Sequence, residues 1–77
     1  MKIANREMVS ALRSMYPAGT RVELISMNDP QAPPAGTTGT ITGIDDIGDI
    51  MVSWNNGSSL NVIPGEDVIK IIQEKTK

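Results

Sequence analysis

The sequence has no cysteine and no histidine, and it contains no phenylalanine, one tryptophan and one tyrosine. Without cysteine there is no disulfide, and without both residue types the usual ligands of a structural zinc ion are missing. A serine or threonine nucleophile would also have no evident general base. We therefore expect a protein that is not an enzyme and that uses no cofactor.

The sequence also lacks a long apolar run. No stretch approaches the roughly 20 residues needed to cross a bilayer, and Arg6 and Glu7 interrupt the N-terminus before an apolar signal region can form. We therefore expect a cytoplasmic protein with no membrane association. At 77 residues there is room for one domain with a modest core. Such a core needs support from a packed extra element or from self-association.

What is present is a bias toward β-branched residues. The chain holds ten isoleucines and five valines against three leucines. Branching at Cβ restricts the side chain and suits a pleated, half-buried surface. The apolar residues make up 39% of the chain, which is ordinary for a folded domain. The composition therefore predicts a mainly β protein.

The N-terminal segment predicts a helix over about residues 5–15. Asn5 can cap its start, and Tyr16-Pro17 ends it because proline disfavours the helical conformation of the residue before it. An isolated helix of three turns is unstable in water, so its apolar stripe must dock on the rest of the chain, on a partner or on a second copy. The stripe that helical spacing predicts consists of Met8, Ala11, Leu12 and Met15.

Beyond Pro17 the apolar residues alternate with polar ones, as they do in strands. Residues 27–36 contain three prolines and predict a long, stiff loop. Asn55-Asn56-Gly57 predicts a hairpin turn, because Asn and Gly tolerate positive φ. Residues 64–67 predict a second tight turn. The expected strands are about 20–25, 38–44, 49–54, 60–62 and 68–72.

The second expected strand carries glycines at positions 36, 39 and 43, which is typical of a strand that coils tightly where another backbone crosses it. Together these features predict a small five-stranded SH3-like barrel preceded by one N-terminal α-helix. An OB-fold usually needs a longer chain and often a helix between strands three and four, whereas the three-residue turn Asn55-Asn56-Gly57 follows strand three here. We divide the chain into a helix over 1–16, a barrel over 17–72 and a frayed polar tail over 73–77.

The stretch from Tyr16 to Ile72 contains YPAGTRVELISMNDPQAPPAGTTGTITGIDDIGDIMVSWNNGSSLNV. On this stretch the chain resembles the domain of unknown function 4314 family, small proteins or domains of bacteria, phages and mobile elements. The resemblance implies a bacterial or phage setting and little chemistry. Residues 36–44 are also similar to the KOW-type segment of ribosomal and transcription proteins, and 50–57 to a strand and turn of peptide-recognising barrels in ubiquitin ligases. Barrel geometry alone can produce both likenesses.

Charge is distributed unevenly: residues 1–16 carry a net charge of +2 and residues 17–72 a net charge of −5. Trp54, at the end of an alternating strand, can be a core residue or a contact residue. The Asp45–Asp49 turn can be a solvated turn or a hard-cation site, although it lacks the spacing of a calcium loop. As candidate partner-binding surface we predict the turn acids and two aromatic or outward residues: Asp29, Asp45, Asp46, Asp49, Met51 and Trp54.

These features favour a non-enzymatic module that binds an unidentified protein partner, with the helix as a possible site of homo-oligomerisation. The alternative is a nucleic-acid-associated protein that uses the basic helix residues Lys2, Arg6 and Arg13, or an acidic decoy of a DNA-binding enzyme. Direct contact with phosphates requires clustered cations, and residues 17–72 hold two basic residues against seven acidic ones. Protein binding is therefore the first interpretation.

Overall fold

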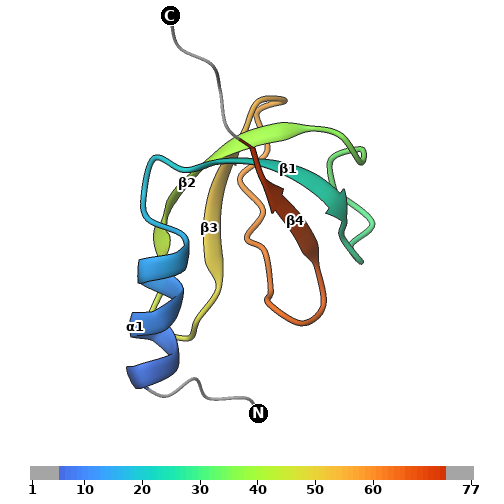
Figure 1. Ribbon diagram of the computed structural model, residues 1–77. Coiled ribbons are helices and arrows are strands. Elements are labelled where there is room, and N and C mark those ends of the chain that lie inside the picture. Colours follow the sequence, from blue (N-terminus) through green and yellow to red (C-terminus); the bar gives the residue numbers. More distant parts are fainter. Residues whose placement is uncertain (1–5, 73–77) are drawn as a thin grey trace, which may run out of the picture.

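The computed structural model describes residues 6–72, which form one helix and a four-stranded antiparallel sheet (Figure 1). Helix α1 packs beside β2, and the sheet order is β3-β2-β1-β4. No helix within residues 6–72 is long and apolar enough to cross a membrane. The elements are α1 (Arg6–Met15), β1 (Arg21–Ser26), β2 (Thr38–Ile44), β3 (Ile50–Trp54) and β4 (Val68–Ile71).

The mainly β class and four of the expected strands are confirmed, but the strand expected at residues 60–62 is wrong. Val62 makes only an isolated bridge to Ile50, with N···O distances of 2.9 and 2.8 Å. The ladder does not extend because side chains bind the neighbouring backbone groups. The Leu60 carbonyl accepts from the Trp54 indole, and the Ile63 amide donates to Asp67. The sheet of residues 6–72 thus has four strands and is not closed.

The core lies on the inner face of this curved sheet. Trp54 is part of it, with 2% of its surface exposed and its Nε1 donating to the Leu60 carbonyl at 3.0 Å. The core interpretation of Trp54 is therefore confirmed, and the residue is not available to a partner at the surface. The buried apolar residues are Val9, Val22, Leu24, Ile41, Ile44, Ile50, Val52, Trp54 and Val62.

Two glycines of β2, Gly39 and Gly43, lie beside the paired strand β3. A Cβ on Gly39 would lie 2.9 Å from the Ser53 carbonyl oxygen and from a ring atom of Trp54. Gly43 follows an irregularity in the β2–β3 register, where the strand bends. The predicted close crossing of β2 by another backbone is therefore confirmed at Gly39.

The turn after β3 is confirmed, with a conformation that differs from the expected one. Gly57 alone has positive φ there, at 93°, and neither Asn55 nor Asn56 adopts it. Trp54 accepts from the Gly57 amide and donates to the Ser58 carbonyl. This is a three-residue connection in which the glycine takes the left-handed position.

Helix α1 buries a different face from the one expected. Its buried residue is Val9, while Leu12 and Tyr16 pack partly against the core. Met8 and Met15 are 50% and 58% exposed, so the expected stripe does not dock as a whole on the rest of the chain, and its docking on a partner or a second copy stays a prediction. Positions 9, 12 and 16 also have helical spacing, and the smaller valine fits closer to the sheet. Asn5, the expected cap, lies outside the described residues.

Candidate functional site

Exposed apolar side chains gather along one side of α1. Seven large apolar side chains are exposed within residues 6–72, and five of them line two hollows that share Leu12 and Pro64. We call these joined hollows the apolar groove. Scattered apolar residues are ordinary on a protein surface, but a contiguous group marks a contact surface. The five exposed residues are Met8, Met15, Ile47, Ile63 and Val68.

The larger hollow, of about 330 Å³, lies at the C-terminal half of α1. Met15 and Tyr16 line its helix side, and Val68 lines its β4 side. The smaller hollow, of about 60 Å³, lies between Met8 and the turn that carries Ile47. The groove therefore runs along α1, with the helix as one wall and the turns before β3 and β4 as the other.

The turn before β4 is held by the Asp67 carboxylate. One oxygen accepts from the Ile63 amide at 2.9 Å and the other accepts from the Asn28 amide at 3.2 Å. The Ile63 carbonyl in return accepts from the amides of Glu66 and Asp67. These bonds fix the backbone between Ile63 and Val68, so both side chains are presented to the groove from a rigid turn.

The turn before β3 is held in the same way by Asp45. Its Oδ1 accepts from the Ile47 amide at 3.2 Å and from the Asp49 amide at 2.8 Å. Gly48 adopts a φ of 92° to close the turn. Ile47, 61% exposed, is consequently held outward at its apex. Of the two interpretations of this turn, the one in which aspartate bonds its own backbone is confirmed.

The acids of this turn make separate contacts in the structure. Asp45 is engaged with backbone amides, and the Asp46 carboxylate faces Arg13 instead of its neighbours. Within the part of the chain that the structure describes, no three acidic side chains are grouped so that they could hold a metal ion.

The structure brings together only part of the predicted surface. Asp49 lines the apolar groove, while Asp46 lies on the other side of the same turn. Asp29 sits in the β1–β2 loop, where it accepts from the Gln31 amide at 2.8 Å. Met51 alternates with the buried residues of β3 and is half-buried on the face away from the core. Ile47 and Ile63 were missed because they lie in turns, outside any alternating pattern.

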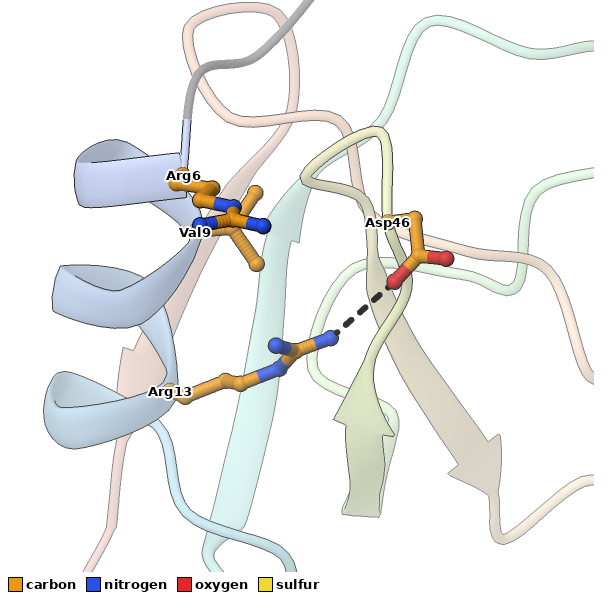
Figure 2. Close-up of a pocket in the computed structure, with 4 residues that line it drawn as sticks. All are labelled: Arg6, Val9, Arg13 and Asp46. Atoms are coloured by element: carbon orange, nitrogen blue, oxygen red, sulfur yellow. Dashed lines mark hydrogen bonds and ion pairs between the residues drawn. The ribbon is translucent and has the colours of Figure 1, made fainter.

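A third hollow, of about 330 Å³, lies on the opposite side of the turn before β3 and is lined by Arg6, Val9, Arg13 and Asp46. Figure 2 shows both arginine side chains reaching from α1 toward the turn that carries Asp46. Arg13 Nη2 donates to the Ile44 carbonyl at 3.0 Å and lies 3.4 Å from Asp46 Oδ1. We call this the arginine hollow.

A family model described as "Domain of unknown function (DUF4314)" matches residues 5–72, which is most of the chain. No curated protein gives a match. The resemblance found in the sequence is therefore confirmed, and its description carries no activity.

Proposed function

We propose a binding function for this chain, which belongs to the family described as domain of unknown function DUF4314. It is a non-enzymatic protein-binding module, and the apolar groove is its contact surface. The observation that carries the proposal is the gathering of five exposed large apolar side chains on one groove, two of them held outward by rigid turns. When a partner covers exposed apolar surface of this kind, the free energy of the system falls.

We further infer that the fold is an SH3-like barrel whose fourth strand is reduced to one bridge. Three features support this: the order β3-β2-β1-β4, the bridge of Val62 to the outer edge of β3, and the long loop after β1. In Figure 1 the segment that carries this bridge runs between β3 and β4. In such a barrel the turn at the end of this segment, before β4, forms part of the groove wall opposite α1.

The charge at the groove points to the chemistry of the partner. Asp49 and Asp67 line it, and residues 17–72 carry a net charge of −5. Complementary charge speeds association and disfavours wrong partners. The occupant is therefore a segment of another protein that carries apolar side chains flanked by lysine or arginine.

The test is selection of peptides from a random library against the 77-residue protein. Enriched peptides should combine apolar residues with lysine or arginine. In calorimetry, the groove variants Ile47→Thr and Ile63→Thr should each weaken binding of a selected peptide by about tenfold, because a buried isoleucine contributes about 1.5–3 kcal/mol. Ile71→Thr, an equally exposed isoleucine outside the groove, is the matched control and should bind as the wild type does.

Acidic enriched peptides, or equal losses for groove and control variants, would contradict the proposal. Light scattering tests for a second copy on the groove: an oligomer that Ile47→Thr dissociates would show that self-association covers it, and the proposed occupant would then be wrong. Charge reversal at Asp49 should also weaken peptide binding and make it less sensitive to salt.

A nucleic-acid-associated protein is the second candidate function, either by direct binding or as an acidic decoy. The observation that favours direct binding is that Arg6 and Arg13 come together in one hollow. Binding of a single-stranded oligonucleotide should then fall steeply as salt rises, because phosphate contacts release counterions. A decoy should bind the enzyme and not the oligonucleotide.

A further inference from the structure

The arginine hollow lies apart from the apolar groove, on the other side of the turn before β3. Arg6 and Arg13 are seven residues apart, which is about two helical turns, so they lie on one face of α1. Figure 2 shows both side chains on the side of α1 that faces the turn carrying Asp46. The hollow is open to solvent and has a volume of about 330 Å³.

One of the two cations is held in place. Arg13 Nη2 donates to the Ile44 carbonyl at the end of β2, at 3.0 Å. This bond joins α1 to the sheet and orients the guanidinium, leaving its other N–H groups toward the hollow. An oriented guanidinium loses less freedom when it binds a ligand.

The acid in the hollow, Asp46, holds Arg13 only loosely. Asp46 is the single acidic residue among residues 6–72 that lines the hollow, and its contact to Arg13 is long, at 3.4 Å. Its side chain is fully exposed and that of Arg13 is 53% exposed. An exposed pair of this kind contributes little, because water screens it. The hollow therefore has two cations, one loosely held anion and an excess of positive charge.

We propose that the arginine hollow binds a phosphate group between Arg6 and Arg13, and that the phosphate displaces Asp46 from Arg13. Each guanidinium presents paired N–H donors that match two oxygens of a phosphate. A tetrahedral phosphate has enough oxygens to accept from two arginines that approach from different directions, whereas the Asp46 carboxylate contacts Arg13 alone among the cations of residues 6–72. The proposal is independent of the apolar groove and of its partner.

The test is a titration of the ¹⁵N-labelled protein with inorganic phosphate at constant ionic strength, with chloride as the matched salt and acetate as the matched carboxylate. Phosphate should shift the amide signals of α1 and of residues 44–47 in a saturable way, and chloride and acetate should not. Arg6→Gln should weaken phosphate binding at least tenfold. Lys70→Gln, which removes an exposed cation far from the hollow, is the control and should leave binding unchanged.

Asp46→Asn separates a phosphate site from general attraction to positive charge. The amide has no negative charge to compete for Arg13, so phosphate should bind several-fold more tightly than to the wild type. Weaker binding by Asp46→Asn, unchanged binding by Arg6→Gln, or equal shifts with chloride or acetate would each overturn the proposal. Circular dichroism confirms that each variant is folded.

The source of the phosphate is determined by a second titration, with a short single-stranded oligonucleotide. If the oligonucleotide binds more tightly than inorganic phosphate, and Arg6→Gln weakens both, the hollow receives a backbone phosphate. If inorganic phosphate binds and the oligonucleotide does not, the hollow receives a free phosphate or a small phosphate ester. If neither shifts the signals of α1, the proposal is wrong.

Discussion

Replacing Gly39 with alanine tests the closest contact in the sheet. The new Cβ would lie 2.9 Å from three heavy atoms: the Ser53 carbonyl oxygen, Trp54 Cε3 and Val52 Cγ1. One belongs to the backbone of β3, and the other two belong to buried core side chains. None of them is the free end of a flexible side chain, so β2 and β3 must separate locally to accept the methyl group.

Two opposing effects determine how much Gly39→Ala lowers the free energy of unfolding. Overpacking a well-packed core costs about 1–3 kcal/mol, and the lower entropy of the unfolded alanine chain returns about 0.4–1 kcal/mol. A net loss of about 1–2 kcal/mol lowers Tm by about 5–15 °C in a domain of this size.

Gly43→Ala is the matched control for this prediction, because it makes the same change in the same strand. Its nearest neighbour is the Met51 methyl group at 3.2 Å, the far end of a flexible side chain that can turn away. Thermal unfolding followed by the fluorescence of Trp54, the only tryptophan, measures both variants. If Gly39→Ala melted no lower than Gly43→Ala, the close approach of β2 and β3 would be refuted.

Two further predictions concern hydrogen bonds that hold the groove in shape. Trp54→Phe removes the donor to the Leu60 carbonyl and should cost about 1–3 kcal/mol in urea unfolding followed by circular dichroism; a neutral result would mean that this bond does not stabilise the segment before Ile63. Asp45→Ala should cost about 1–2 kcal/mol because two amides of the turn lose their acceptor, whereas Asp46→Ala should not change stability measurably. Equal effects of the two aspartate variants would contradict the roles assigned to them.

The sheet could be predicted from the sequence because alternation is a local property. Val22 and Leu24, and then Ile50, Val52 and Trp54, alternate with polar or half-buried residues, and they form the core. The missing strand at residues 60–62 could not be predicted in the same way. Leu60 and Val62 also alternate, but the Leu60 carbonyl accepts from the Trp54 indole, and the Ile63 amide donates to the Asp67 carboxylate. Which backbone groups a side chain will bind depends on the folded arrangement.

The face of α1 that packs on the sheet could not be predicted from the sequence either. Met8, Leu12 and Met15 have helical spacing, and so do Val9, Leu12 and Tyr16, which share Leu12 with them. Periodicity alone does not separate two stripes that lie next to each other on one helix. The choice depends on the side chain that fits closest to the sheet, and the structure places Val9 there.

The acidic residues beside the candidate site were predicted from the sequence, but its exposed apolar residues were not. Acids on turns are visible in a sequence, and Asp46 and Asp49 do lie beside the two hollows. Ile47 and Ile63 belong to no strand or helix pattern, so nothing local marks them as exposed. Only the turns built by Asp45 and Asp67 direct them outward. Turn acids in this chain therefore serve two purposes: some hold the backbone, and others remain at the surface.

The apolar groove and the arginine hollow both depend on the position of α1. The helix forms one wall of the apolar groove with Met8 and Met15, and one wall of the arginine hollow with Arg6 and Arg13. Within residues 6–72 it has a single buried residue, Val9, and its polar tie to the sheet is the bond from Arg13 to Ile44. A short helix held by so few contacts is only weakly stabilised in its docked position. A ligand that bound either surface would favour the docked helix by mass action. Because the docked helix forms a wall of the other surface as well, binding at one surface would then favour binding at the other.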